Sequence, residues 1–172
     1  MTKGLEAIES DVGENMKVVL EPLQKDVDED LELLNQLTNE CFKEHFNWRP
    51  TPLESTVYLV REDFSWKPQG WFFALLEGKH VGFVGAGIGE LDNRAENVKR
   101  GWILSIGVLK PYRRTGIGTR LILHGMNFLK ANGIATAMLG VDDSNVTKAK
   151  QLYEKVGFRE VWKQSFYEKS IA

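Results

Sequence analysis

A basic pair followed by two closely spaced glycines forms the segment best suited to bind an anion. In VLKPYRRTGIGTRL (108–121), Arg113 and Arg114 precede Gly116 and Gly118. A strand that enters such a turn and continues as a helix directs free backbone N–H groups at one point, and the helix N-terminus adds about half a positive charge. Glycines let an anion approach the backbone closely. The segment therefore predicts a diphosphate-binding turn or, as the alternative, a glycine-capped corner with solvated arginines.

Two established nucleotide-binding motifs do not fit this turn. No Gly-Lys-Ser/Thr follows the glycines, so the segment is not a P-loop. The third glycine of the dinucleotide-binding fingerprint is also missing. RRTGIG instead resembles the Arg/Gln-x-x-Gly-x-Gly/Ala signature of the GNAT family of N-acetyltransferases. Val108, five residues before Arg113, matches the usual first residue of that signature.

A second segment supports this resemblance. NVTKAKQLYEKVGF (145–158) is similar to the A-x-x-x-Y-E-x-x-G-F helix end of the same family. The resemblance covers roughly Met16 to Glu168, and the order of the expected elements agrees throughout. Two separated motifs in the right order are more specific than either one alone. The resemblance implies an acetyl-CoA-dependent N-acetyltransferase with the GNAT fold.

The resemblance also implies where acetyl-CoA binds. Its diphosphate is expected to bind the backbone from Arg114 to Thr119. Its pantetheine arm is expected to lie beside the open edge of the strand SIGVL. That strand is expected to diverge from the strand ATAMLGVD. A backbone N–H at or next to Val108 is expected to polarise the thioester carbonyl. Asn145 either hydrogen-bonds the pantetheine arm or only caps the helix, because it precedes Tyr153 by eight residues instead of the usual seven. The residues expected to bind the cofactor are Ile106, Val108, Arg113, Arg114, Thr115, Gly116, Ile117, Gly118, Thr119 and Asn145.

Tyr153 is the expected catalytic residue. By resemblance, its hydroxyl protonates the departing CoA thiolate. The reference pKa of a phenol is about 10 and that of a thiol about 8.5, so the transfer is slightly uphill unless the site assists it. The alternative is a half-buried helix residue that packs beside Leu152 and Val156.

The sequence does not identify the general base that removes a proton from the amine. The strand GWILSIGVLK contains no acid. Glu90 and Asp142 are the acids nearest the expected cleft and are weak substrate-site candidates, although each also suits a solvated or capping role. An acidic lining would suit a cationic amine. Other polar residues expected near the acceptor are Glu40, Glu44, Asn47, Asp92 and Glu96.

The elements that must position these residues follow from periodicity and from Gly and Pro. They alternate in a β-α-α-β-β-β-α-β-α-β order, which predicts an α/β domain with a mixed sheet flanked by helices; the resemblance adds that the sheet is mostly antiparallel. Residues 91–100 are expected to form a polar loop. Strands are expected over 16–24, 70–90 (two strands with a turn at 77–79), 101–110, 134–142 and 158–170, and helices over 26–45, 53–63, 117–132 and 145–156.

Length and composition narrow the class of protein. The 172 residues fit a single domain over 16–172, preceded by a flexible or short helical arm over 1–15. A net charge of -2 argues against a protein that coats nucleic acid. One cysteine, Cys41, and three distant histidines predict neither a disulfide nor a metal site, and suit a cytoplasmic protein. No apolar run is long enough to cross a membrane.

Three functions remain open at this point. The first is transfer of the acetyl group from acetyl-CoA to a primary amine of a small molecule or protein, by direct attack in a ternary complex. The second is a non-catalytic acyl-CoA-binding or sensing module, which would not need Tyr153. The third is a phosphate-binding interaction domain without CoA. The presence of Tyr153 favours the enzyme over the two non-catalytic alternatives. Separately, a homodimer is possible, because dimers are common among members of the family that the chain resembles.

Overall fold

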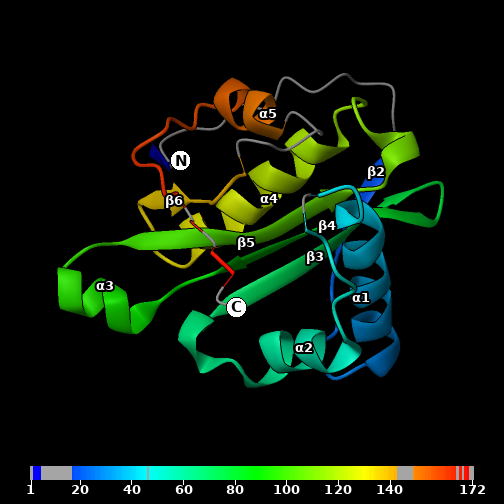
Figure 1. The fold of residues 1–172 in the computed structure, drawn as a ribbon, viewed down its shortest axis with the longest axis horizontal. Helices are drawn as coiled ribbons and strands as arrows, with labels where there is room; N and C mark the ends of the chain where they lie inside the picture. Colours follow the sequence, from blue (N-terminus) through cyan, green and yellow to red (C-terminus); the bar gives the residue numbers. More distant parts are fainter. Residues whose placement is uncertain are drawn as a thin grey trace.

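The computed structural model describes residues 2–4, 17–45, 47–142, 149–165, 167 and 169–170. Within them, six strands form one mixed sheet with the order β1-β6-β5-β4-β3-β2, so the predicted α/β class is confirmed (Figure 1). All neighbouring strands are antiparallel except β5 and β6. The strands are β1 (Thr2–Gly4), β2 (Val18–Pro22), β3 (Gln69–Leu76), β4 (Lys79–Gly87), β5 (Arg100–Val108) and β6 (Thr136–Met138).

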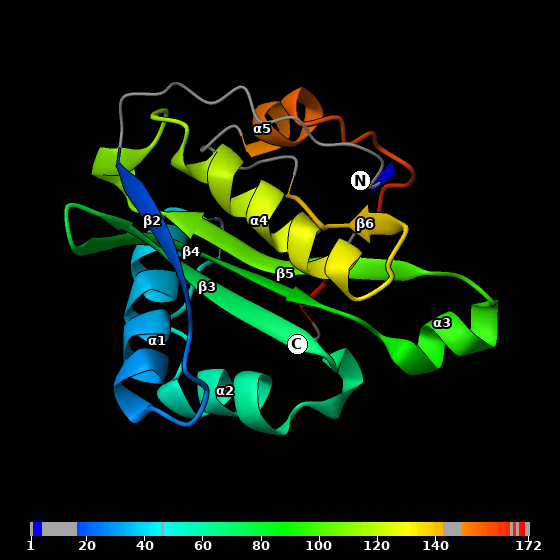
Figure 2. The ribbon, with the colours of Figure 1, turned by 180° about the vertical axis from the view of Figure 1, so that it is seen from behind.

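Helices cover both faces of this sheet. Figures 1 and 2 show α1 and α2 along one face and α4 and α5 along the other. Each face has its own apolar cluster: Leu31 and Leu34 of α1 pack in one, and Leu121 and Met126 of α4 pack in the other. The helices are α1 (Asp28–Phe42), α2 (Leu53–Val57), α3 (Glu90–Glu96), α4 (Ile117–Ala131) and α5 (Ala149–Lys155).

The turn between β3 and β4 was predicted from Glu77-Gly78-Lys79 and is confirmed. Both Glu77 (φ 52°) and Gly78 (φ 76°) have left-handed backbone conformations. Two consecutive left-handed residues are the conformation that a tight hairpin turn requires, because they match the twist of the flanking strands. The hairpin places β4 beside β5 in the centre of the sheet.

β5 is paired differently along its two halves. On one side it pairs with β4 from Trp102 to Val108, with one irregularity in register. On the other side it pairs with β6 only at residues 100–102. The predicted divergence of the two strands is therefore present, and it begins at Ile103.

The segment 91–100, expected to be a loop, contains most of α3. The salt bridge of Glu90 with Arg94 links residues four positions apart within the helix, which supports a short exposed helix, whereas Glu96 at its end pairs with Arg100 at the start of β5. Asn97 ends it with a left-handed conformation (φ 52°). None of the residues of α3 is buried, so the apolar period that predicts a helix is absent.

The predicted last strand over 158–170 is wrong in the described part of that segment. Only Arg159 makes an isolated bridge there, and Trp162 is 61% exposed. In this structure the outer edge of β6 is occupied by β1, from the arm that we expected to be flexible or helical. The rest of the arm, 5–15, lies outside the described residues. No helix in the described part of the chain is both long and apolar enough to span a bilayer.

Candidate active site

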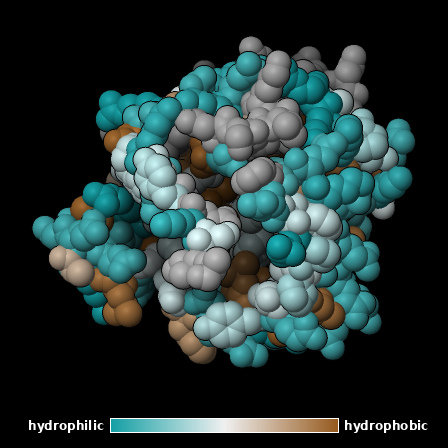
Figure 3. Space-filling view, viewed as in Figure 1, coloured by the Kyte–Doolittle hydropathy of each residue, from teal (hydrophilic) through white to brown (hydrophobic). Residues whose placement is uncertain are grey.

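Two adjoining cavities open where β5 leaves β6. The first, of about 420 Å³, lies between the C-terminal end of α1, β5, the start of α4 and α5. The second, of about 250 Å³, lies between Ile103–Ile106 of β5 and Leu139–Asp142, which follow β6. Figure 3 is a space-filling view from the same side as Figure 1. It shows recessed apolar surface, surrounded by polar residues, near the middle of the face that is turned to the viewer.

The open half of β5 presents backbone groups to the cavities. Leu109 N donates to Val81 O across the β4 side, at 2.9 Å. Because successive amides of a strand point in opposite directions, the N–H groups of Ile106 and Val108 point to the open side. Both residues line the first cavity. This arrangement fits their predicted role in holding an extended cofactor arm or a carbonyl oxygen.

The turn before α4 has the conformation of an anion-binding turn. Arg114 (φ 66°) and Gly116 (φ 88°) both have left-handed backbones, which bring successive N–H groups toward one side. Within the described part of the chain, no side chain caps the start of α4. The hydroxyl of Thr115 donates to Tyr112 O at 2.6 Å. The first amides of α4 therefore keep their capacity to bind an anion.

Gly118 allows α5 to pack close to the start of α4. A Cβ at this position would lie 3.1 Å from Leu152 Cδ2, tighter than ordinary van der Waals contact. Both residues line the first cavity. The second sequence motif is thus brought beside the first, as the family resemblance requires.

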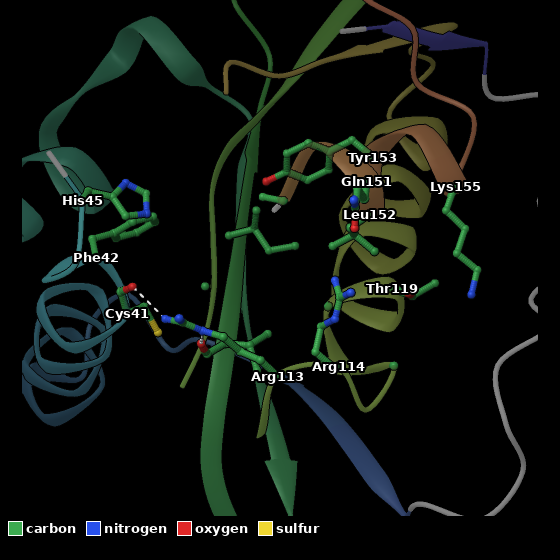
Figure 4. Close-up of a pocket in the computed structure, with 16 residues that line it drawn as sticks. Cys41, Phe42, His45, Arg113, Arg114, Thr119, Gln151, Leu152, Tyr153 and Lys155 are labelled. Carbon is green, nitrogen blue, oxygen red and sulfur yellow. Dashed lines mark hydrogen bonds between the residues drawn. The ribbon is translucent and has the colours of Figure 1, made fainter. Parts of the chain in front are cut away.

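The two adjacent arginines have different roles in the structure. Arg114 is exposed, and Figure 4 shows it beside Thr119 at the mouth of the cavity, with Lys155 of α5 nearby. Arg113 instead donates to Val108 O at 2.9 Å and to Cys41 O at 3.0 Å. The Arg113 side chain therefore ties the end of α1 to the end of β5. Arg113 lines the cavity, and its contact with a cofactor remains a prediction.

Tyr153 lies on α5 at the junction of the two cavities. It is only 6% exposed, and burial raises its pKa to about 12. Its ring packs edge-on against Phe158, with centroids 6.3 Å apart. Figure 4 shows its hydroxyl pointing across the sheet toward the wall that contains Phe42 and His45. The phenol therefore stays protonated at neutral pH, and the raised pKa makes transfer of its proton to a thiolate uphill by about 3.5 pKa units, so a cofactor-filled site would have to assist the transfer.

Four residues line both cavities and so form the neck between them. They come from α1, β5, α5 and the turn after α1. Only Ile106 and Tyr153 were expected from the sequence. The neck residues are Phe42, His45, Ile106 and Tyr153. In the sequence, Phe42 fits the apolar pattern of a core-facing helix, and nothing near His45 distinguishes it from a solvated histidine. Gln151 and Lys155 on α5 also line the first cavity, and their local sequence likewise does not distinguish them from solvated residues.

The remaining predicted residues lie in different places. Asp142 lines the second cavity, whereas Glu90 begins α3, pairs with Arg94 and lines neither cavity. Glu44 binds Lys110 and Arg113, and the hydrogen bonds from these two cations lower the pKa of its carboxyl. Asn145 lies outside the described residues.

A family model described as "Acetyltransferase (GNAT) family" matches residues 31–158, the span that contains both cavities. The chain belongs to the GNAT family. The resemblance inferred from the two motifs is therefore confirmed, and the domain is an acetyltransferase domain.

Individual relatives agree with this assignment. A "Probable N-acetyltransferase san" of Drosophila melanogaster is 39% identical over 88 residues, which are 51% of this chain and 47% of that protein. An "N-alpha-acetyltransferase" of Sulfurisphaera tokodaii is 38% identical over 115 residues, 64% of this chain and 68% of the relative. The chain thus spans about half of the fly protein and about two thirds of the archaeal one.

Solved structures share the GNAT fold. An aminoglycoside acetyltransferase from an uncultured soil metagenomic sample, crystallised with sisomicin, superimposes with a TM-score of 0.69. The comparison covers 89% of this chain and 96% of that structure, at 21% sequence identity. The fold is therefore shared over nearly the whole chain, although its sequence has diverged widely.

Proposed function

We propose that this GNAT domain transfers the acetyl group of acetyl-CoA to a primary amine. The observation that carries the proposal is the continuity of the site. An uncapped helix start opens on one cavity, and a protonated Tyr153 lies at the neck to a second cavity. A diphosphate and a reacting thioester require sites of these two kinds at the two ends of one cleft.

The residues present fit acetyl-CoA. The diphosphate would lie on the amides from Arg114 to Thr119, with Lys155 nearby. The pantetheine arm would extend along the open half of β5, beside the N–H groups of Ile106 and Val108. Tyr153 would give its proton to sulfur as the C–S bond breaks, which is general acid catalysis in a ternary complex.

The acceptor class is narrowed by the sequence relatives. An archaeal relative is named an N-alpha-acetyltransferase, which favours the α-amino group of a peptide or protein over other primary amines. A small-molecule amine is the second candidate, because the second cavity, of about 250 Å³, has room for one. The lone Cys41 is buried as a free thiol, which is compatible with a cytoplasmic location.

Two measurements test the proposal. Acetyl-CoA should raise the melting temperature, because a ligand that binds only the native state stabilises it, and inorganic phosphate should raise it far less. Release of free CoA thiol should then depend on an added amine, chosen from peptides with free N-termini, lysine-containing peptides with blocked N-termini, and aminoglycosides. Binding of acetyl-CoA without thiol release from any of them would assign the acyl-CoA-binding alternative instead.

A further inference from the structure

His45 lies at the neck between the two cavities. The residue follows α1, and its ring packs edge-on against Phe42 with centroids 4.8 Å apart. Its backbone is held in a turn, because His45 N donates to Phe42 O at 2.9 Å and Trp48 N donates to His45 O at 3.1 Å. The ring is therefore presented from a hydrogen-bonded turn and is half-buried at the neck.

His45 and Tyr153 face each other across the neck. Both line the cavity that fits the cofactor and the cavity that remains for the acceptor. Figure 4 shows the two side chains on opposite walls, with the Tyr153 hydroxyl directed toward the wall of His45. A thioester carbonyl located between them would have a proton donor on one side and an imidazole on the other.

Other titratable groups near the neck are less suited to accept this proton. Burial raises the pKa values of the Tyr153 phenol and the Cys41 thiol to about 12, so both hold their protons at neutral pH. Arg113 carries a permanent charge and has no acceptor atom. Asp142 is exposed at the second cavity, and Glu44 is held by Lys110 and Arg113.

The chemistry of proton transfer also favours an imidazole. In water the reference pKa of an α-ammonium group is about 8, that of imidazole about 6.5 and that of an aspartate carboxyl about 3.9. Transfer from an α-ammonium group to imidazole is therefore uphill by about 1.5 pKa units, compared with about 4 for a carboxylate. Transfer from a lysine ammonium to imidazole would be uphill by about 4 units, so an imidazole base suits an α-amino acceptor best.

We propose that His45 is the general base of the acetyl transfer and that it acts on the α-ammonium group of a peptide. This inference rests on the proposed function. His45 takes one proton from the ammonium and later releases it to solvent. The amine nitrogen then bonds to the carbonyl carbon, the C–S bond breaks with its electron pair on sulfur, and Tyr153 protonates the sulfur. The nitrogen of the adduct is cationic after the attack and gives one of its two protons through water to the Tyr153 phenolate, which leaves the neutral amide, so every proton is accounted for.

The test is the pH dependence of kcat/KM for a short peptide with a free α-amino group. His45→Gln should lower kcat/KM at least tenfold at pH 6.5, where the amine is mostly protonated, and the defect should shrink as the pH rises above about 8. The matched control is His80→Gln, because His80 pairs with Glu21 on β2 and lines neither cavity. This control should follow the wild-type profile.

Two further readouts separate the outcomes. Melting curves and acetyl-CoA calorimetry should show that His45→Gln folds and binds the cofactor as the wild type does. An equal defect at every pH, or no defect, would overturn the assignment of His45 while leaving the proposed function in place. Wild-type protein that releases no thiol with any amine at any pH would overturn the proposed function, and the role of His45 with it.

Discussion

The two parts of β5 differ in their strand pairing. Residues 100–102 pair with β6, and Trp102 also pairs with β4, whereas Ile103–Val108 are paired on the β4 side alone. The first half is part of the core, where Gly101 packs directly against Leu129. The second half supplies the open backbone edge of both cavities. We therefore expect the proposed cofactor site to depend on where the pairing of β5 with β6 stops. Changes near the paired part should mainly affect stability, and changes near the open part should mainly affect activity.

The largest effect is expected from Tyr153→Phe on α5, in the cavities beside the open half of β5. Loss of the hydroxyl should lower kcat about 100-fold or more, because general acid catalysis contributes about 10² to 10⁴ in rate. The affinity for acetyl-CoA should change less than about twofold, since the ring remains. Thiol-release kinetics and calorimetry measure the two quantities. An unchanged kcat would show that another group protonates the sulfur.

The opposite pattern is expected in the paired half, from Gly101→Ala. The new Cβ would lie 2.6 Å from Leu129 Cδ2 in a fully buried region, so the free energy of unfolding should fall by about 1–3 kcal/mol. Denaturant unfolding measures this change. Gly140→Ala is the matched control, because a Cβ there meets nothing within 4 Å and should be nearly neutral for stability. Equal destabilisation by the two variants would contradict the packing difference.

A smaller effect is expected at the mouth of the first cavity, from Lys155→Met. Removal of one exposed cation should raise the Kd for acetyl-CoA about two- to fivefold, and added salt should reduce the difference. Lys130→Met removes the same charge at the other end of α4, where it lines neither cavity. Calorimetric titrations at two ionic strengths compare the variants. If both weaken binding equally, the effect reflects net charge and not a local contact.

The last prediction concerns stability at alkaline pH. Burial raises the Tyr153 pKa from 10.0 to about 12, so ionisation is less favourable in the folded state than in the unfolded one. The stabilisation from the neutral phenol is complete below pH 10 and is lost as the pH rises toward 12. Wild-type protein should therefore lose about 1–2 kcal/mol more than Tyr153→Phe between these limits. Parallel stability curves for the two proteins would contradict a buried phenol.

Local sequence signals were sufficient for the elements around the anion-binding turn. Gly116 and Gly118 predicted the turn into α4, and Gly78 predicted the hairpin, because glycine adopts the left-handed conformation found at Gly78 and Gly116 without steric cost. The α3 helix was missed because its side chains are all exposed and carry no apolar period. The last strand over 158–170 was predicted from its residue types, but whether a strand forms depends on a free sheet edge, and β1 occupies the edge of β6.

The site itself was only partly predictable. The motif residues could be named because they belong to two compact segments. Phe42 and His45 reach the neck from α1 and the turn after it, far from both motifs in the sequence, so only the packing of α1 on the sheet brings them to Tyr153. The engagement of Arg113 with Cys41 O and Val108 O is likewise a tertiary contact that residue type alone does not reveal.

Calorimetric titration of the purified protein with acetyl-CoA tests the central claim most directly. If the open half of β5 and the start of α4 hold the cofactor, one molecule should bind per chain, with a Kd well below 1 mM and a heat that free phosphate does not reproduce. Absence of any binding heat at millimolar acetyl-CoA would contradict the account of the site.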